Sequence, residues 1–462
     1  MNKQTIIEQG TNVAVVGFGR AGQALVRYLH KCGANVLVSD MQTRTELSTQ
    51  QQELLDDCSV MFEGGGHSAE FLGQAEIIIV SPGVDYHHPA LIRASELAIP
   101  ILGELALASD KFNAPVIAVT GTNGKTTVTE LIGSLLQGAG KKVFIGGNIG
   151  TPIGDYLLSD EDYEVIVLEV SSFQLELCGE FAPQVGLLLN ITPDHLDRHK
   201  TLENYAAAKM RIFQGNPDRS FAIINAEDPL CTRYRHFSAR KDFGLFGYDG
   251  QCDAVVAGTR IVMSSTRPEQ SYDLGGTALD NLSGMLNSAA ALLALSRFEL
   301  DQNALQLGLE LFQAGEHRMQ QVGKINGIAY INDSKATNTG AVNNAIFQIG
   351  GSIILIAGGR DKGDDYSLLR QSVANHVKKL ILIGEAAEKL GETLADLVPT
   401  AYPASLEEAV EQASSAAVPG DTVLLSPACA SFDMFDNYQH RGICFSDTVR
   451  QLADHSFSGV SQ

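Results

Sequence analysis

The stretch Val119-Thr120-Gly121-Thr122-Asn123-Gly124-Lys125-Thr126-Thr127 decides how this chain folds. It follows an apolar, β-branched run, 115–119, and precedes a segment, 128–137, with the composition of a helix. In a strand, turn and helix of this kind, the backbone N–H groups of the turn and the helix dipole attract an anion. Lys125 would reach the β- and γ-phosphates of a nucleotide, and the Thr126 hydroxyl would bind Mg²⁺. The pattern therefore predicts a phosphate-binding loop.

This loop is shorter than the full motif. The full pattern has a glycine five positions before Gly124, where this chain has Val119. The remaining motif is Gly121-x-x-Gly124-Lys125-Thr126. A tight surface turn that carries a lysine is the alternative. The strand before the turn and the helix after it favour phosphate binding, because both are where that mechanism needs them.

Length and composition predict a chain of about three globular domains, since domains average roughly 150 residues and this chain has 462, of which 44% are apolar. The formal charge of −21 argues against a nucleic-acid partner. Its seven cysteines are scattered without metal-binding spacing, which is typical of reduced thiols. With no apolar run of about 18 residues and no signal peptide, we expect a cytoplasmic protein without membrane insertion. No oligomerisation signal is evident, so a monomer is expected.

Residues 1 to about 104 alternate strand and helix patterns. A buried strand runs into Gly17-Phe18-Gly19-Arg20-Ala21-Gly22, and the next strand ends at Asp40. In such a Rossmann-type unit, the helix N-terminus meets a diphosphate and the carboxylate meets a ribose. The pattern alone is typical of NAD binding, but UDP offers the same two groups. Glycines that only let helix and strand pack closely are a further alternative. Another strand ends at 81–83, in a turn that should face the same crevice.

Residues 105 to about 314 form a second α/β unit, opened by the phosphate loop. A buried strand delivers Glu169 to its carboxyl end, the edge that faces ligands in open α/β sheets. A carboxylate beside a phosphate loop is the expected Mg²⁺ partner, and an acid that caps the next helix is the alternative. Polar groups crowd the loop 190–199, which favours a functional His195 over a structural one. Lys209 lies on a helix with few polar groups and, from the sequence alone, is a solvated charge.

Residues from about 315 to 462 indicate another parallel α/β domain, whose apolar strands end in polar loops at 332–338, 358–363 and 426–431. The carboxyl ends of parallel strands meet at one edge, so these loops should gather hydroxyls and lysines there; ordinary loop residues are the alternative. The predicted organisation is an α/β chain of three domains: a Rossmann-like domain over 1–104, a central mononucleotide-binding P-loop ATPase over 105–314 and a second Rossmann-like domain over 315–462.

Taken together, these motifs resemble the Mur ligase family over nearly the whole chain. The matching residues are Gly121 to Thr126, Glu169 with Ser171-Ser172-Phe173-Gln174, Asp194-His195, Lys209, His317-Arg318 and Asn332-Asp333-Ser334-Lys335. The C-terminal motif 424–433 resembles that of the members that add D-glutamate. The resemblance implies an N-terminal domain that binds UDP, a central ATPase and a C-terminal domain that binds the incoming amino acid.

The resemblance also implies a reaction, ATP-driven amide formation between UDP-N-acetylmuramoyl-L-alanine and D-glutamate in peptidoglycan synthesis. The substrate carboxylate takes the γ-phosphoryl group to give an acyl phosphate and ADP. The amine of D-glutamate then attacks the acyl carbonyl, and phosphate leaves. Phosphoryl transfer of this kind needs positioning and charge neutralisation more than covalent help. The family uses two Mg²⁺ ions, placed here at Thr126 with Glu169 and near His195, with Lys209 carbamylated beside them.

Site residues follow from the resemblance position by position. The catalytic set is Lys125, Glu169, His195 and Lys209, and the last two join Thr126 and Glu169 as metal-site residues. The ATP set is Gly121, Thr122, Asn123, Gly124, Lys125, Thr126, Thr127, Asn287, His317, Arg318 and Asp333. The residues expected to bind the UDP part of the substrate are Gly19, Arg20, Ala21, Asp40, Gly83 and Asn148. The residues expected to bind D-glutamate are Lys335, Thr337, Lys362, Ser431 and Tyr438.

Three positions depart from the family pattern. The family has G-x-H-N-x-x-N before the Ala-rich helix, but here Leu286 replaces the histidine and Ala290 replaces the second asparagine. Those polar groups help to hold adenine in relatives, so we expect the base to be recognised less stringently. Tyr438 stands where the family has phenylalanine.

Two other functions remain open at this point. One is another ATP-dependent ligase of the same architecture, such as a folylpolyglutamate synthase-like enzyme or a different Mur ligase. The N-terminal Rossmann unit argues against the former, and the motif 426–433 argues against the latter. The other is a nucleotide-sensing module without turnover, which would have no need for Glu169, His195 and Lys209 together.

Overall fold

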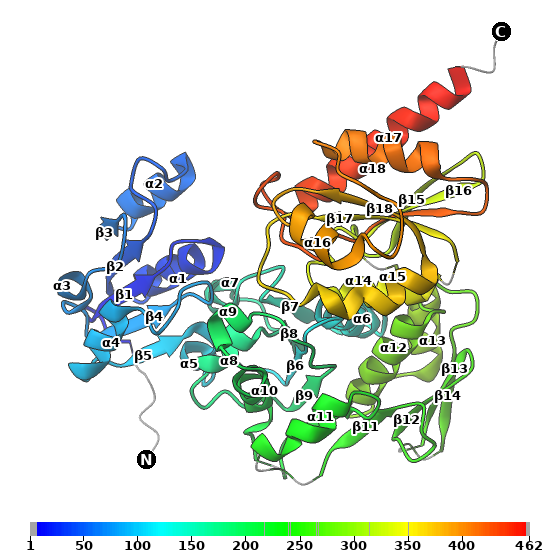
Figure 1. The fold of residues 1–462 in the computed structure, drawn as a ribbon. Helices are drawn as coiled ribbons and strands as arrows, with labels where there is room; N and C mark the ends of the chain where they lie inside the picture. Colours follow the sequence, from blue (N-terminus) through cyan, green and yellow to red (C-terminus); the bar gives the residue numbers. More distant parts are fainter. Residues whose placement is uncertain are drawn as a thin grey trace. The chain divides into compact units, whose positions relative to one another are not determined.

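The computed structural model describes residues 7–458 except 217, 239, 241, 265, 267, 314 and 350. Within these residues the strands form three sheets of five, nine and six strands (Figure 1). The chain divides into two compact units. The first unit contains the first two sheets and is built from the residues up to Ile191, Thr201–Thr277 and Met285–Leu311. The second unit contains the third sheet and is built from Thr192–Lys200, Ala278–Gly284 and the residues from Phe312 onward.

The first sheet is parallel, with the strand order β3-β2-β1-β4-β5. The central strand β1 is apolar throughout because both of its faces are covered: Val13 and Val15 enter one core and Ala14 and Val16 the other. The order reverses between β1 and β4, which places a ligand crevice at their carboxyl ends. Its elements are β1 Asn12–Val16, α1 Arg20–Lys31, β2 Asn35–Asp40, α2 Thr49–Asp57, β3 Met61–Gly64, α3 Ala69–Leu72, β4 Ile77–Val80, α4 Pro89–Glu96 and β5 Ile101–Gly103.

The central sheet has the order β14-β13-β12-β11-β10-β9-β6-β8-β7 among the described residues. Strand β6 lies between β8 and β9 and is buried along its whole length, as its β-branched run predicts. The elements are α5 Glu104–Ala108, β6 Val116–Thr120, α6 Lys125–Gly138, β7 Val143–Gly147, α7 Ile153–Leu158, β8 Val165–Glu169, α8 Ser172–Glu176, β9 Val185–Leu188, α10 Leu202–Met210, η1 Arg211–Phe213, β10 Phe221–Asn225, α11 Pro229–Tyr234, η2 Arg235–Phe237, β11 Gly244–Gly247, β12 Ala254–Ala257, β13 Arg260–Met263, β14 Gln270–Asp273, α12 Leu282–Leu295 and α13 Gln302–Leu311.

The third sheet has the order β15-β16-β20-β17-β18-β19, with only the β15–β16 pair antiparallel among the pairs that the structure describes. The strands β16, β20 and β17 are neighbours and run parallel. The polar loops predicted after them therefore all lie at the same edge of the sheet. The elements are α9 Leu196–His199, β15 Gln320–Ile325, β16 Ile328–Asn332, α14 Thr339–Ile349, β17 Ile353–Gly358, η3 Tyr366–Leu369, α15 Arg370–His376, β18 Val377–Ile383, α16 Ala387–Leu394, β19 Thr400–Ala401, α17 Leu406–Ala416, β20 Thr422–Leu425 and α18 Tyr438–Ser458.

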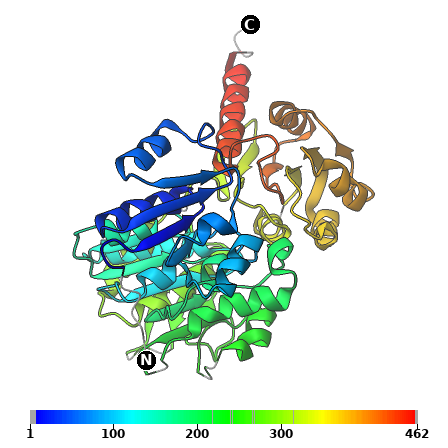
Figure 2. The same cartoon turned by 90° about the vertical axis from the view of Figure 1, so that its left-hand side faces the viewer.

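Helix α18 begins against the third sheet and its later turns extend beyond it, as Figures 1 and 2 show. Phe445 and Val449 of this helix pack in the core beside β16 and β20. The helix therefore has its first three turns anchored in the domain. Of the helices in the described part of the chain, none combines the length and the apolar character that crossing a membrane requires.

Candidate active site

The predicted phosphate loop forms between β6 and α6. Gly124 caps the helix with a φ of +83°, and Gly121 has a φ of +151°. Side chains rarely adopt these left-handed values, so both positions need glycine. A Cβ atom on Gly124 would also lie 2.9 Å from the side-chain oxygen of Asn287, which places Asn287 directly against the loop.

Asn190, two residues after the neighbouring strand β9, holds the loop. Its side-chain oxygen accepts hydrogen bonds from the backbone N–H groups of Thr122 at 3.1 Å and Asn123 at 2.8 Å. Its amide donates back to the Asn123 carbonyl at 3.0 Å. The sequence analysis did not single out this residue. An amide placed just after the strand beside the phosphate loop is the signal that could have identified it.

The ammonium group of Lys125 lies over the loop. It donates hydrogen bonds to the carbonyl oxygens of Gly121 at 3.0 Å and Thr122 at 2.8 Å. The backbone N–H groups and this cation are thus brought to one turn, which is the chemistry that a polyphosphate needs.

Thr126 and Glu169 form a buried pair at the end of the loop. The Thr126 hydroxyl donates to the Glu169 carboxylate at 2.6 Å, and the Asn148 amide donates to the other carboxylate oxygen at 2.7 Å. The described residues contain no group of three or more His, Cys, Asp and Glu side chains that could hold a metal ion. A hydroxyl and a carboxylate nevertheless suit Mg²⁺, which takes few protein oxygens and completes its shell with water and phosphate.

Lys209 is buried, so its interpretation as a solvated charge is wrong. Its side chain is 1% exposed, and its ammonium donates to the Gly121 carbonyl at 2.8 Å. The ammonium also lies 4.4 Å from the centroid of the Tyr205 ring, and the Tyr205 hydroxyl donates to Thr122 at 3.2 Å. Periodicity alone could not show this, because the helix α10 is apolar on several sides and packs its lysine face against the loop.

Five of the six predicted UDP residues lie at the switch point of the first sheet, and the sixth, Asn148, directly follows β7 of the central sheet. The backbone N–H of Phe18 donates to the Asp40 carboxylate, and Ser81 donates to the Gly17 carbonyl at 2.9 Å. The glycine turn, the end of β2 and the turn that leads to Gly83 are therefore held together. Arg20 reaches the central domain, where it donates to the Gly150 carbonyl at 3.0 Å.

His195 and Lys362, which is predicted to bind D-glutamate, both lie next to Asp194, in the second unit. The Asp194 carboxylate accepts from Lys362 at 3.0 Å and from the Asn338 amide at 3.2 Å. The nearest ring nitrogen of His195 is 3.8 Å from the same carboxylate, and His195 has a φ of +56°. A non-glycine residue in this left-handed region is uncommon, although histidine adopts it more often than most residues, and such residues cluster at active sites.

Lys335 and Tyr438 also meet in the second unit, where the ammonium lies 4.0 Å from the centroid of the ring. Ser431 is buried on the neighbouring loop, after β20, and Thr337 is half-buried. The structure thus places Lys335, Thr337 and Ser431 on loops that follow the adjacent strands β16 and β20, and Tyr438 at the first residue of α18.

His317 and Asp333 are both buried near the carboxyl end of β16, which Asp333 directly follows. Asp333 accepts from Ser426 at 2.9 Å and from the Met319 backbone at 3.2 Å, and burial raises its pKa to about 7. His317 contacts the Asn332 amide at 3.1 Å, and burial lowers the pKa of its imidazole.

The two departures on α12 differ in their surroundings. Ala290 is fully buried, whereas Leu286 is partly exposed. An asparagine at position 290 would therefore enter the core of the helix packing. Of these two positions, Leu286 is the one from which a side chain could reach a ligand.

A buried carboxyl, Glu104, was also missed by the sequence analysis. It lies at the first residue of α5, and its carboxylate accepts from the Gln174 amide at 2.6 Å. Gln174 in turn accepts from the Ser171 backbone at 2.8 Å and completes the capping box of α8. Burial raises the pKa of Glu104 to about 7. The one signal in the sequence is an acid inside the apolar run 101–108.

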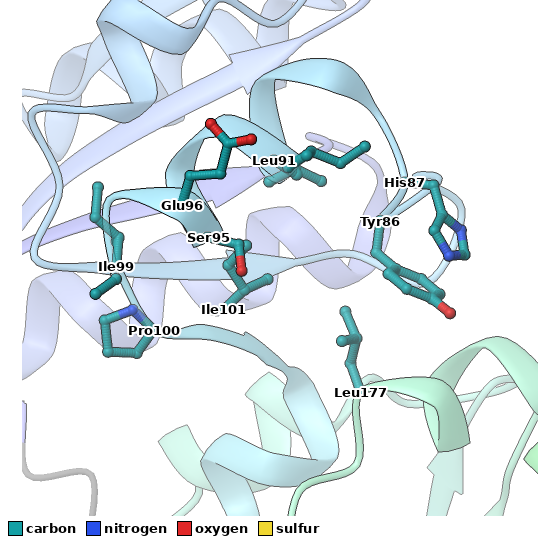
Figure 3. Close-up of a pocket in the computed structure, with 11 residues that line it drawn as sticks. Tyr86, His87, Leu91, Ser95, Glu96, Ile99, Pro100, Ile101 and Leu177 are labelled. Atoms are coloured by element: carbon teal, nitrogen blue, oxygen red, sulfur yellow. The ribbon is translucent and has the colours of Figure 1, made fainter.

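A separate cleft of about 660 Å³ lies along α4 and β5 (Figure 3). Its walls are largely apolar, and Leu177 points into it from the segment after α8. None of the predicted site residues lines this cleft, so we assign it no part in the chemistry.

The chain belongs to the Mur ligase family. Three family models match it in order: the Mur ligase MurD-like N-terminal domain over residues 11–103, the Mur ligase middle domain over 119–287 and the Mur ligase glutamate ligase domain over 317–429. The family resemblance inferred from the motifs is thereby confirmed, as is the α/β fold of three domains.

Within the family, the chain is similar over its full length to proteins named UDP-N-acetylmuramoylalanine–D-glutamate ligase. It is 47% identical to the one from Desulfotalea psychrophila over 98% of this chain and 99% of the relative. It is 38% identical to the one from Koribacter versatilis over 96% of this chain and 98% of the relative.

Solved structures share the fold at low sequence identity. A pseudomurein peptide ligase type C from Methanothermus fervidus matches with a TM-score of 0.59 and 19% identity, over 96% of this chain and 100% of that one. The MurF ligase from Thermotoga maritima, solved in complex with ADP, matches with a TM-score of 0.59 and 18% identity, over 96% of both chains. These two likenesses show the architecture alone.

Proposed function

We propose that this chain is an ATP-dependent ligase that joins D-glutamate to UDP-N-acetylmuramoyl-L-alanine in peptidoglycan biosynthesis. The reaction runs through an acyl phosphate and releases ADP and phosphate. The observation that carries the proposal is the buried Thr126–Glu169 pair at the end of a glycine-built phosphate loop. The 47% identity to a relative of that name supports the choice of substrates.

The phosphate loop supplies the first step of this reaction. A bare carboxylate is a poor acylating agent, so its oxygen must first take the γ-phosphoryl group. The loop N–H groups and Lys125 would neutralise the phosphates, and Asn287 would contact the nucleotide beside Gly124. Mg²⁺ would be held by Thr126 and Glu169, and it supplies charge neutralisation at the phosphates when bound. From the resemblance we retain Thr127, His317, Arg318 and Asp333 as nucleotide-binding residues.

A second Mg²⁺ site near His195 is proposed from the resemblance. Imidazole is an uncommon ligand for this hard ion, which prefers oxygen. The Asp194 carboxylate beside His195 supplies an oxygen of the preferred kind. We also propose that Lys209 carries a carbamate, because a carbamate would turn a buried cation into an oxygen anion next to the phosphate loop.

The UDP part of the substrate would bind at the switch point of the first sheet. Asp40 and the turns at Gly19 and Gly83 are joined there by two hydrogen bonds, from the Phe18 backbone N–H to the Asp40 carboxylate and from the Ser81 hydroxyl to the Gly17 carbonyl. Arg20 links that turn to the loop that carries Asn148 in the central domain. We retain Gly19, Arg20, Ala21, Asp40, Gly83 and Asn148 as UDP-substrate residues.

The second unit would bind D-glutamate. The two carboxylates of D-glutamate need two cations, and Lys335 and Lys362 lie at one sheet edge, on the loops after β16 and β17, which flank β20. In the structure Lys362 is paired with Asp194. The incoming carboxylate would replace that partner or share the lysine with it. Thr337 on the loop of Lys335, Ser431 on the loop after β20 and Tyr438 at the start of α18 complete the set.

The test is phosphate release by the full chain with ATP and Mg²⁺. We expect release only when D-glutamate and UDP-N-acetylmuramoyl-L-alanine are both present, with one new amide in the product by mass spectrometry. Lys125→Ala should abolish it, while Lys141→Ala, a surface lysine paired with Glu164, should not. Release with L-glutamate and a folate would indicate a folylpolyglutamate-type enzyme. Nucleotide binding without release under any combination would indicate a sensing module.

We further propose a cytoplasmic monomer. All seven cysteines are free thiols, as a reducing compartment allows. Light scattering after size-exclusion chromatography tests the oligomeric state, with a mass near 49.4 kDa expected.

A further inference from the structure

Arg441 is a buried cation in the first turn of α18. Its side chain is 1% exposed, yet all three guanidinium nitrogens make hydrogen bonds. Nε donates to the Ser334 hydroxyl at 3.0 Å, and one terminal nitrogen donates to the Ser334 carbonyl at 2.9 Å and the Cys429 carbonyl at 3.1 Å. The other terminal nitrogen donates to the carbonyls of Gly358 at 3.4 Å and Ala430 at 3.3 Å. Five acceptors thus match the five N–H groups of the side chain.

These acceptors belong to the three loops at the carboxyl ends of β16, β17 and β20. The strands are neighbours in the order β16-β20-β17. A planar fork of five donors fixes distances and angles between all three loops at once, which a flexible lysine cannot do.

The same three loops carry the proposed D-glutamate residues. Lys335 directly follows Ser334, and Ser431 directly follows Ala430. Lys362 lies four residues beyond Gly358. The Ser334 hydroxyl also donates to the Tyr438 carbonyl at 2.8 Å, so the start of α18 is tied to the same cluster. Arg441 therefore sets the spacing of the side chains that would contact the amino acid, although its own side chain is buried.

The charge of Arg441 is not neutralised by an ion pair within the described residues, because each of its hydrogen bonds goes to a carbonyl or a hydroxyl. The nearby Asp433 carboxylate attracts this charge without forming an ion pair with it. Desolvating such a cation is costly, and an apolar side chain could anchor a helix without that cost. A dicarboxylate bound on the loops above would meet this charge in a medium of low dielectric constant, where attraction is strong.

We infer that Arg441 is a positioning residue for the amino-acid substrate: it holds the three loops in one arrangement, and its buried charge favours a dicarboxylate over a monocarboxylate. This inference rests on the proposed function. It predicts two separable effects. Loss of the planar fork weakens D-glutamate binding through the loop geometry, and loss of the charge weakens the preference for a dicarboxylate.

The experiment compares Arg441→Lys and Arg441→Met in the full chain. Lysine keeps the charge but loses the fork, and methionine keeps the apolar stem but loses both. We expect the KM for D-glutamate to rise roughly 10- to 100-fold in both variants, with KM values for ATP and the UDP-linked substrate within about twofold of the parent. The preference for D-glutamate over D-norvaline, which lacks the side-chain carboxylate, should fall in the Met variant and persist in the Lys variant.

Arg450→Met is the matched control, since Arg450 lies on the same helix but is exposed and paired with Asp447; it should leave all KM values unchanged. If melting curves show that the Arg441 variants do not fold, Ser334→Ala is the replacement test. It removes one hydrogen-bond acceptor of Arg441 and should still raise the KM for D-glutamate several-fold. Equal changes in all three KM values, or none, would overturn the inference while the proposed function stands. A parent protein without D-glutamate-dependent turnover would overturn both.

Discussion

The Thr126 hydroxyl donates a 2.6 Å hydrogen bond to the Glu169 carboxylate, and both side chains are buried. The register of the parallel pair β6–β8, which sets Val119 opposite Glu169, brings the two residues together. A shift of one residue would turn the carboxylate to the other face of the sheet. The Asn148 amide holds its second oxygen, so the carboxylate is fixed before any ligand arrives.

Glu169→Gln should therefore lower kcat by roughly 100-fold or more, because a neutral amide is a poor ligand for Mg²⁺ at the phosphates. A higher Mg²⁺ concentration should be needed for half-maximal activity. The measurement is phosphate release across a Mg²⁺ series. Glu164→Gln, which removes an exposed carboxylate paired with Lys141, is the control. An unchanged Mg²⁺ dependence in the Glu169 variant would exclude it as a metal-site residue.

Discrimination between ATP and GTP should be weak. Leu286 replaces a polar group of the family pattern, and each neutral hydrogen bond that is lost is worth about 0.5–1.5 kcal/mol. Leu286→His should sharpen the preference for ATP, measured as the ratio of kcat/KM values. Ala290→Asn should instead lower the melting temperature, because Ala290 is fully buried and the amide would lack partners there. A strong preference for ATP in the unmodified protein would contradict this prediction.

The parts of the site that could be predicted from the sequence are those that local chemistry determines. Gly121 and Gly124 mark a turn with positive φ, and a β-branched run followed by Glu169 marks a buried strand that ends at a ligand edge. The principle that carboxyl ends of parallel strands share an edge then groups the loops.

The parts that escaped prediction depend on contacts between distant segments. Asn190 reaches the phosphate loop across 67 positions of sequence, and Arg441 reaches Ser334 across 107. Helix periodicity says which face of a helix is buried, but not which carbonyl a long side chain meets there. For the same reason Lys209 was taken as a surface charge, although it ends beneath the phosphate loop.

Lys209→Ala should abolish activity, and added formate or acetate should restore part of it. The side chain is buried against the Gly121 carbonyl, so its removal leaves a space that a small carboxylate can fill. If Lys209 bears a carbamate, the carboxylate replaces the lost oxygen ligands. Phosphate release would be measured across a carboxylate series at constant ionic strength, with chloride as the control anion. Rescue by small amines alone would show that an ammonium group, and not a carbamate, acts here.

Glu104 should make the stability of the first unit depend on pH. It is 2% exposed, and burial raises the pKa of its carboxyl to about 7 from an ordinary value of 4.5. The folded state therefore binds this proton more tightly than the unfolded state does. Below pH 4.5 the Glu104 carboxyl is protonated in both the folded and the unfolded state, so its ionisation does not lower the stability. Between pH 4.5 and 7 the unfolded state has lost the proton first, so stability falls as the pH rises, by about 3 kcal/mol over the whole window.

Glu104→Gln removes the ionisation and keeps the oxygen that accepts from Gln174. We expect its melting temperature to exceed that of the parent protein at pH 8 and the difference to shrink towards pH 5. Glu96→Gln, which alters an exposed carboxylate of α4, should leave the pH profile unchanged. The capping box of α8 begins at Ser171, two residues after Glu169, and its Gln174 donates to Glu104, so kcat should also vary less with pH in the Glu104 variant. Parallel melting curves for variant and parent from pH 5 to 8 would mean that Glu104 stays ionised in the folded protein.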